Sequence, residues 1–451
     1  MSFIKKNKNL LYYIGAIIIS LLPILIIYIS IPHSLYKQNN GTKNKLSKNA
    51  NLSLYKQCIT PKFIITDIQE ELTQQKINFE KKQQALDTIF SQLYKKGIIN
   101  GNVLIAQKKI ILYRQTFGYS SLNNKDPLNE KSQFQIASLS KTFTAVAILK
   151  LYEQGLLDLD DTIQKYIPGF PYDGVTIRML LSHRSGIPNY IYAFADKAKN
   201  GLQRPTNKEI LQWFIEQKPK RYYLPDKKFS YNNSNYMILG SIIETISKNS
   251  YEEYLQKNIL APLEMHSTVL PPNSYEKLTN STYGHEGFRR IDTDFFDNII
   301  GDKGIYTTTD DLYKWYQALQ TNCLLKEETL NEAFKVHSPE KTTAFNYGYG
   351  FRLLTDGHNN TKGIFHTGWW KGYNALFYFD KQNEFIVIML LNKRSHIVYN
   401  KSFLYTVFTK LQLFNTYHAP VSSNKKTFIK KKPTKPIKHK KAKKKKQQKN
   451  K

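Results

Sequence analysis

Segments with the composition of β-strands lie at both ends of the central part of this chain, with a long helical and loop region between them. Two such segments precede that region, and four follow it; together they lie at about 102–107, 109–117, 347–355, 364–370, 373–379 and 385–392. Residues Asp380–Asn383 fit a hairpin turn between the last two segments. This order predicts an α+β fold. An antiparallel β-sheet would take strands from both ends of the domain and be flanked by helices, with an inserted, mostly helical lobe in between.

Apolar residues recur with helical spacing over about 66–96 and again from about Ser138 to Gln154, and a final helix is expected over about 396–413. The polar residues before the first of these helices indicate a linker. We therefore expect a linker and leading helix over 33–82 and the main folded domain over 83–417.

Residues Leu10 to Pro32 form a stretch of 23 residues without a charge, rich in Ile and Leu. At about 1.5 Å per residue, a helix of this length spans a hydrocarbon core of about 30 Å. A cleaved signal peptide is the alternative, but its apolar region is usually shorter and ends in a small-x-small site, which is not evident here. We expect one transmembrane anchor over 10–32, with residues 1–9 as a short cytoplasmic end. Lysines flank both sides, so the positive-inside rule does not decide the orientation.

The formal charge of +31 is concentrated at the two ends of the chain. Residues 1–57 carry eight lysines and residues 424–451 carry fifteen, with no acidic residue in either stretch. The Lys-rich end, 418–451, is predicted to be a disordered tail that could contact anionic surfaces. It has one aromatic residue, Phe428, within its lysine-rich part and no recognition helix, so we expect no specific nucleic-acid partner.

Composition excludes several other classes of protein. The chain is 41% hydrophobic, with 31 Tyr and 25 Phe, which is not the composition of a disordered protein. Its two cysteines, Cys58 and Cys323, are too few for a disulfide scaffold or for a cysteine-built zinc site. No metal ion and no organic cofactor are implied.

The strongest chemical signal is Ser138-Leu139-Ser140-Lys141 at the start of the helical stretch that ends near Gln154. A serine and a lysine three residues apart lie on one face of a helix. Serine is a weak nucleophile at neutral pH, and an adjacent amine can activate it. Ser-x-x-Lys occurs eight times in this lysine-rich chain, and a helix cap with a solvated lysine is the alternative reading. Only at Ser138 does a long amphipathic helix follow directly.

Two further patterns carry chemistry in combination with the first. Tyr231-Asn232-Asn233 is the only Tyr-x-Asn in the chain; a tyrosine beside an ammonium can act as a base, and the asparagine can bond both lysine and substrate. Alone, it would be a polar turn before a helix. His366-Thr367-Gly368, followed by Trp369, lies on a predicted strand. The glycine lets substrate lie along the strand edge, and the next N–H can serve as an oxyanion donor.

The three patterns, in this order, resemble the Ser-x-x-Lys, Tyr-x-Asn and Lys/His-x-Gly motifs of the serine β-lactamase and penicillin-binding-protein superfamily. The segment from Leu180 to Ile187 (LLSHRSGI) resembles that family's LLSHTSG. The segment from Gly301 to Leu312 (GDKGIYTTTDDL) resembles its GDGGLYST-x-x-DL. The resemblance covers about residues 83–413. Class C β-lactamases, DD-peptidases and related esterases are the most similar members.

The resemblance implies a role for each motif residue. Ser138 would be the acylated nucleophile, and Lys141 and Tyr231 would share the general-base work. Asn233 would position the substrate, His366, Thr367 and Gly368 would form the substrate-binding strand, and the N–H groups of Ser138 and Trp369 would form the oxyanion hole. Two features differ from class C β-lactamases: a histidine, His366, stands where they have lysine, and two bulky rings follow the motif.

We therefore expect a membrane-anchored serine hydrolase that acts through an acyl-enzyme on an amide or ester, such as a peptidoglycan D-Ala peptide, a β-lactam or a small ester. The alternative is a penicillin-recognising sensor or binding module that is acylated without turnover. Because the family works outside the cytoplasm, the resemblance implies a single-pass membrane protein with an extracytoplasmic catalytic domain, on the periplasmic side.

Overall fold

A computed structural model of the chain describes residues 69–410, apart from 200–203, 271–279, 292–294, 341–343 and 357. The predicted anchor (10–32), the predicted cytoplasmic end (1–9) and the predicted tail (418–451) lie outside the described residues. Within the part of the chain that the structure describes, no helix is both long and apolar enough to span a bilayer. The predicted domain boundary at residue 83 falls inside helix α3, Gln69–Lys95.

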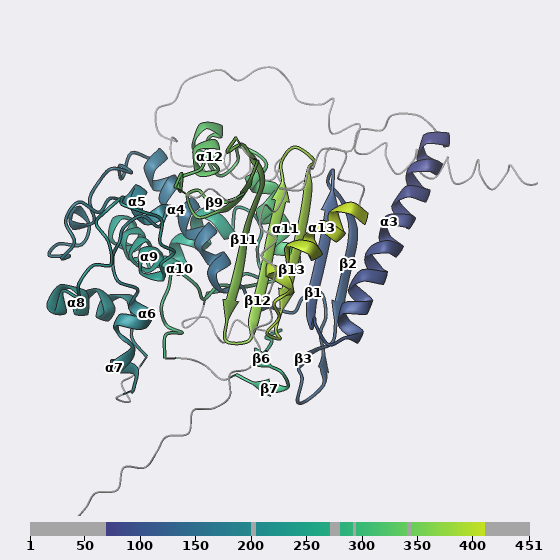
Figure 1. Cartoon of the computed structure of the whole chain (residues 1–451), viewed down its shortest axis with the longest axis horizontal. Coiled ribbons are helices and arrows are strands. Elements are labelled where there is room, and N and C mark those ends of the chain that lie inside the picture. The colour runs from purple at the N-terminus through teal and green to yellow at the C-terminus, as the bar shows by residue number, and fades with distance from the viewer. Residues whose placement is uncertain are drawn as a thin grey trace, which may run out of the picture. The chain divides into compact units, whose positions relative to one another are not determined.

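The core of the fold is an antiparallel sheet of seven strands in the order β2-β1-β13-β12-β11-β10-β9 (Figure 1). Its strands are β1 Gly101–Gln107, β2 Ile110–Phe117, β9 Phe345–Tyr347, β10 Arg352–Thr355, β11 Thr361–Trp370, β12 Tyr373–Asp380 and β13 Phe385–Leu391. Strand β1 pairs with β13, so that Gly101 lies opposite Leu391 and strands from the two ends of the domain are neighbours inside the sheet. The predicted α+β fold with strands from both ends is confirmed.

One predicted strand, 347–355, is two strands in the structure. The chain turns between β9 and β10, where the N–H of Gly348 donates to the carbonyl of Phe351 at 2.8 Å. Gly350 has a φ of +82°, a conformation that glycine adopts without strain and that interrupts an extended strand. The turn sends β10 back against β9, with Arg352 opposite Tyr347.

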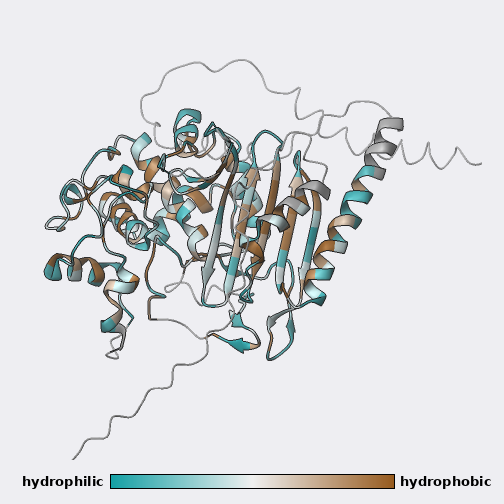
Figure 2. Ribbon diagram, in the orientation of Figure 1, coloured by the Kyte–Doolittle hydropathy of each residue, from teal (hydrophilic) through white to brown (hydrophobic). Residues whose placement is uncertain are grey.

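Alternate side chains of the central strands belong to two hydrophobic cores. Leu104 and Ile388 belong to the larger core beneath the helical lobe. Val103 and Val387 belong to a smaller core on the other face. Helix α3 and helix α13 (Lys401–Lys410) cover that second face with Leu86, Phe90, Phe403 and Val407 (Figure 2). Because successive side chains of a strand point to opposite faces of the sheet, one strand contributes residues to both cores.

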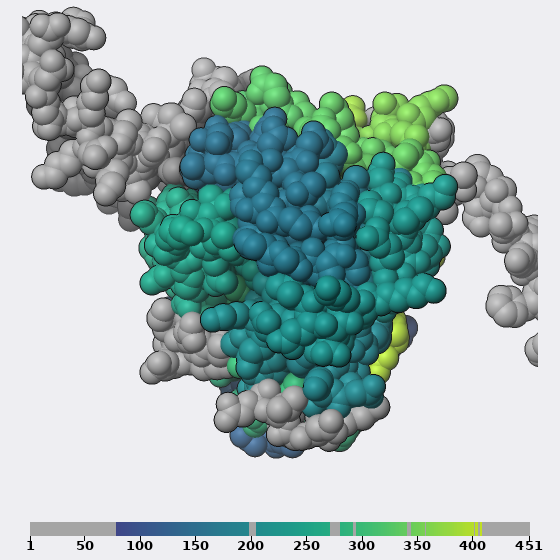
Figure 3. All heavy atoms as spheres, turned by 90° about the vertical axis from the view of Figure 1, so that its left-hand side faces the viewer, coloured from purple at the N-terminus to yellow at the C-terminus, as the bar shows by residue number. Residues whose placement is uncertain are grey.

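The helical lobe lies between β2 and β9 in the sequence and packs against the first face of the sheet. Its central helices, α4 (Ser140–Glu153) and α9 (Asn233–Ser247), pack against each other and are mostly buried. Segments coloured blue to green form the face of the molecule seen in Figure 3. The other helices of the insertion are α5 Ile177–Leu181, α6 Tyr190–Ala193, α7 Ala195–Lys199, α8 Asn207–Gln217, α10 Tyr251–Leu255, α11 Thr309–Leu319 and α12 Glu327–Ala333. Each of the two central helices begins at one of the motifs predicted from the sequence.

Several short elements complete the described fold. They are the helical turns η1 Ala137–Leu139, η2 Ile163–Lys165, η3 Gln256–Leu260 and η5 Ile397–Tyr399, and the strands β3 Tyr119–Ser121, β4 Asp126–Pro127, β5 Phe134–Gln135, β6 His285–Glu286, β7 Arg289–Arg290 and β8 Tyr306–Thr307. The predicted final helix over 396–413 is η5 followed by α13 within the described residues.

Candidate active site

Ser138 lies on a tight helical turn between strand β5 and helix α4. The preceding residue, Ala137, has a φ of +48°, which is unusual for a residue with a side chain and costs backbone strain. The turn is held by the N–H of Ile136, which donates to the carbonyl of Ile305 at 2.9 Å. Ser138 is partly exposed and lines a pocket, whereas its neighbours Ala137 and Leu139 are buried. The strained turn therefore presents the hydroxyl group to the pocket.

Lys141 is wholly buried and its ammonium has three acceptors. Its Nζ atom donates to Oγ of Ser138 at 3.0 Å, to Oδ1 of Asn233 at 2.8 Å and to the carbonyl oxygen of Asp302 at 2.7 Å. Three acceptors match the three hydrogens of an ammonium. In the neutral amine, one of these positions becomes a lone pair, which could accept the proton of Ser138.

Tyr231 and Asn233 come from the segment that leads into helix α9. The side chain of Asn232 caps this helix by accepting the N–H of Ser234, which fixes the orientation of Asn233. The Tyr231 ring lies between two cations: Nζ of Lys141 is 5.3 Å from its centroid, and Cζ of Arg352 is 4.8 Å from it. Its hydroxyl oxygen is buried without a hydrogen-bond partner among the described residues. The structure thus brings both residues to Lys141.

Strand β11 forms one wall of the site. Thr367 and Trp369 line the pocket, and the Trp369 side chain is 50% exposed. Gly368 packs so tightly on the turn before Ser138 that a Cβ atom at residue 368 would overlap the carbonyl oxygen of Ile136. This close approach brings the backbone of β11 beside the backbone of Ser138, where the oxyanion hole is expected.

His366 is wholly buried and is absent from the pocket lining. The N–H of Asn232 donates to Nδ1 of His183 at 3.2 Å, so the hydrogen of the His183 ring is on Nε2. This Nε2 atom lies 3.2 Å from the hydroxyl oxygen of Tyr347 and donates to it. The Tyr347 hydroxyl can then donate to Nε2 of His366 at 3.2 Å, and Nδ1 of His366 donates to the carbonyl of Thr367 at 2.8 Å. The hydrogen-bond pattern assigns one tautomer to His366.

Burial keeps the pKa of His366 well below its ordinary value, and the charges of Arg352 and Lys141 lower it further. Burial also raises the pKa of Tyr347 well above its ordinary value. Both side chains are therefore neutral at neutral pH. The His366 ring lies behind Tyr231, with the two ring centroids 6.3 Å apart, and does not line the pocket.

The pocket has a volume of about 920 Å³ and a basic lining. Two lining residues are acidic, Glu286 and Asp302, and six are basic: Arg289, Arg290, Lys303, Arg352, Lys371 and Arg394. Glu286 is paired with Arg394 in an ion pair. None of these basic residues was predicted as a site residue, although Lys303 stands where the family's GDGG motif has a glycine.

Among the described residues, no group of three or more His, Cys, Asp or Glu side chains is placed to hold a metal ion. Where helices α4 and α9 meet strand β11, a hydroxyl group (Ser138), an amine (Lys141) and a phenol (Tyr231) lie close together at the edge of the pocket. A hydroxyl group beside an amine and a phenol is an arrangement suited to nucleophilic catalysis.

Comparison with known proteins agrees with this geometry. The family model described as Beta-lactamase matches residues 85–402. The chain is 31% identical over 343 residues to penicillin-binding protein 4* of Bacillus subtilis, which covers 72% of this chain and 75% of that protein. It is 29% identical over 334 residues to protein Flp of Staphylococcus aureus strain MW2, covering 70% of this chain and 64% of that protein.

Solved structures share the fold. A penicillin-binding-protein homologue from Pyrococcus abyssi superimposes with a TM-score of 0.63 and 26% identity, covering 74% of this chain and 77% of that one. FmtA from Staphylococcus aureus gives 0.62 and 19% identity, covering 80% and 95% respectively. With the family match across most of the described residues, these relatives establish that the chain belongs to the Beta-lactamase family, within the serine β-lactamase and penicillin-binding-protein superfamily.

Proposed function

We propose that this protein is a serine hydrolase that acts through an acyl-enzyme on Ser138. The observation that carries the proposal is the buried Lys141 ammonium, which lies 3.0 Å from Oγ of Ser138 and is held by Asn233 and by the Asp302 carbonyl. An amine fixed at this distance is placed to activate the hydroxyl group. The family membership supports the same chemistry.

In the proposed reaction, Oγ of Ser138 attacks the carbonyl carbon of an amide or ester, and its proton passes to Lys141 in its neutral form or to Tyr231. The carbonyl oxygen becomes an oxyanion that the N–H groups of Ser138 and Trp369 stabilise; each such donor contributes roughly 10²- to 10³-fold in rate. The leaving group takes the proton as the carbonyl re-forms. Water then hydrolyses the ester on Ser138, which regenerates the hydroxyl group.

The basic pocket supports a substrate that carries a carboxylate. Arg352 stacks on Tyr231, and its Nε atom is buried without a hydrogen-bond partner among the described residues. A guanidinium in this position can bind a carboxylate on the leaving-group side of the scissile bond. Peptidoglycan D-Ala peptides and β-lactams both carry such a group, and two relatives are named for penicillin binding. Short esters are a third substrate class.

We propose that Leu10–Pro32 anchors the protein in the cell membrane, with the catalytic domain outside the cytoplasm, on the periplasmic side. The support is the uncharged length of that segment. A reporter enzyme fused to the C-terminus tests the orientation: activity of a reporter that works only in the cytoplasm would overturn it.

We also propose that the Lys-rich tail contacts anionic surfaces. The test compares how the full-length protein and a protein lacking 424–451 bind to anionic vesicles across salt concentrations.

Covalent labelling tests the proposed reaction. Full-length wild type should be labelled by a fluorescent penicillin and by a serine-reactive fluorophosphonate, and Ser138→Ala by neither. Lys141→Met should lose labelling, whereas Lys150→Met, the same substitution in the same helix, should not. Labelling of Ser138→Ala at the wild-type rate would rule the proposal out.

The rate at which labelled protein recovers separates a hydrolase from a sensor. Recovery within minutes indicates turnover, and a permanent label indicates the sensor.

A further inference from the structure

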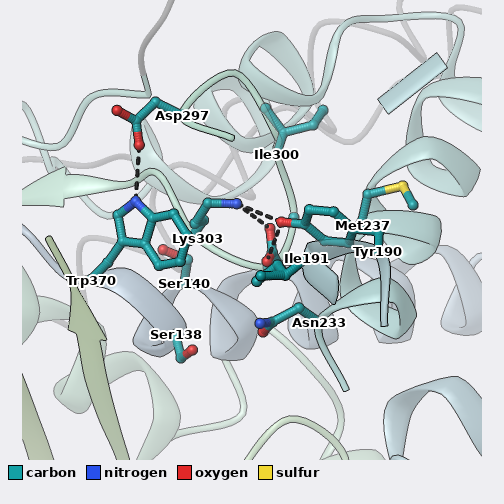
Figure 4. Close-up of polar contacts among 12 residues, drawn as sticks. Ser138, Ser140, Tyr190, Ile191, Asn233, Met237, Asp297, Ile300, Lys303 and Trp370 are labelled. Atoms are coloured by element: carbon teal, nitrogen blue, oxygen red, sulfur yellow. Dashed lines mark hydrogen bonds and ion pairs between the residues drawn. The ribbon is translucent and has the colours of Figure 1, made fainter. Parts of the chain in front are cut away.

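A second buried lysine, Lys303, lines the same pocket, and its side chain is 5% exposed. Its Nζ atom donates to the hydroxyl oxygen of Tyr190 at 2.6 Å and lies 3.4 Å from Oδ1 of Asp302. The Tyr190 hydroxyl in turn donates to Oδ2 of Asp302 at 2.9 Å. These three side chains form a closed triangle. Figure 4 shows the side chains of Lys303 and Tyr190 pointing toward each other, with Ser138 and Asn233 nearby.

The Lys303–Asp302–Tyr190 triangle is buried and has Trp370 beside it. The ring of Trp370 lies 4.9 Å from Nζ of Lys303, and its Nε1 atom donates to Oδ1 of Asp297 at 2.9 Å. Burial lowers the pKa of Lys303, and the Asp302 carboxylate opposes that effect. Because the cation is paired with Asp302 and has a second carboxylate, Asp297, nearby, it is poorly suited to attract an anionic substrate.

The triangle is connected to the catalytic lysine from two sides. The backbone carbonyl of Asp302 is an acceptor for Nζ of Lys141 at 2.7 Å. The backbone N–H of Tyr190 donates at 2.8 Å to Oγ of Ser234, the neighbour of Asn233, which is a second acceptor for Lys141. The triangle therefore joins the two chain segments that supply two of the three Lys141 acceptors.

We propose that Lys303 is a positioning residue for Lys141. The ion pair between Lys303 and Asp302, together with the hydrogen bonds of Tyr190, fixes the position of the Asp302 carbonyl group. That carbonyl group in turn orients the amine of Lys141 toward Ser138. The inference rests on the proposed acyl-enzyme chemistry. The family-like segment GDGG has a glycine at this place, whereas this chain has Lys303, so the device belongs to this protein and not to the shared motif.

The test measures the acylation rate constant and the apparent dissociation constant separately, with a fluorescent penicillin and full-length protein. Lys303→Met should lower the rate constant by about 10- to 100-fold, because small errors in the position of a catalytic group have effects of this size. The dissociation constant should stay within about twofold, since no substrate contact is lost. Tyr190→Phe should act in the same direction, and adding it to Lys303→Met should cause little further loss, because both act through one unit. Lys150→Met is the control.

Lys303→Met leaves Asp302 as an unpaired buried acid, which could impair folding. The double variant Lys303→Met/Asp302→Asn removes both charges and retains the backbone carbonyl, so it should recover thermal stability without recovering the rate. An unchanged rate constant in a folded variant, or a change confined to the dissociation constant, overturns the inference. If neither penicillin nor fluorophosphonate labels the wild-type protein, the proposed function is overturned as well. If wild type and Lys303→Met are labelled at equal rates, only this inference is overturned.

Discussion

Gly368 lies directly against the carbonyl oxygen of Ile136, with no space for a side chain between strand β11 and the turn that carries Ser138. A Cβ atom at residue 368 would also lie 3.2 Å from Cβ of Ala137, the residue with the strained φ. The distance between the two backbones therefore depends on the absence of a side chain at residue 368, and both proposed oxyanion donors sit on those backbones.

Gly368→Ala is expected to lower the acylation rate by about 10²-fold or more, because the strand must move away from Ser138. The measurement is the rate of labelling by a fluorophosphonate. Gly155→Ala is a suitable control: Gly155 also has a positive φ, but nothing lies within 4 Å of its added Cβ. This control should lose about 1–2 kcal/mol of stability, because alanine is strained at a positive φ, and should retain its labelling rate. Wild-type labelling of Gly368→Ala would contradict the proposed oxyanion site.

Tyr347→Phe tests the hydrogen bonds behind the pocket wall. Removing the hydroxyl group takes away the partner of Nε2 of His366 and one of the contacts of His183, both in a buried place. The free energy of unfolding should fall by about 1–3 kcal/mol, as for other unsatisfied buried groups. Denaturant unfolding measures this loss. Because Tyr347 is absent from the pocket lining, the penicillin dissociation constant should change much less.

The stability of the protein should fall as the pH is lowered from about 6.5 to 5. Burial lowers the pKa of His366, His285 and His337 below the ordinary value of 6.5. Below that pH the unfolded chain binds protons at these side chains and the folded chain binds fewer, so acid favours unfolding. Each such histidine contributes a slope of up to about 1.4 kcal/mol per pH unit.

Denaturant unfolding of wild type and His366→Gln at several pH values measures how much His366 contributes to the pH dependence of the free energy of unfolding. The variant should show a shallower dependence on pH in this window. His358→Gln, on the surface, is the matched control and should retain the wild-type slope. Equal slopes for wild type and His366→Gln would show that His366 is protonated in the folded protein as readily as in the unfolded one.

Local patterns predicted the sheet and the position of the site, because strands and helix starts are marked by residues adjacent in sequence. Ser138 and Lys141 share one turn, so their contact follows from helical geometry. The partners of Lys303 could not be predicted in this way, since Tyr190 is 113 residues away and nothing local pairs them. The buried position of His366 was also missed, because a motif gives the order of residues and not which face of a strand is covered.

Arg352→Met tests whether the substrate carries a carboxylate. The Arg352 guanidinium stacks on Tyr231, and its Nε atom is buried without a hydrogen-bond partner among the described residues. The guanidinium is therefore placed to donate hydrogen bonds to an anionic group of the substrate. The apparent dissociation constant for a penicillin, which carries a carboxylate, should rise by about 10- to 100-fold, the effect of 1.4–3 kcal/mol from a charged hydrogen bond. Labelling by a neutral fluorophosphonate should change little. Arg352→Lys should recover only part of the affinity, because an ammonium does not offer the paired N–H donors of a guanidinium. Equal losses with both probes would instead mean that Arg352 acts on Tyr231 and not on the substrate.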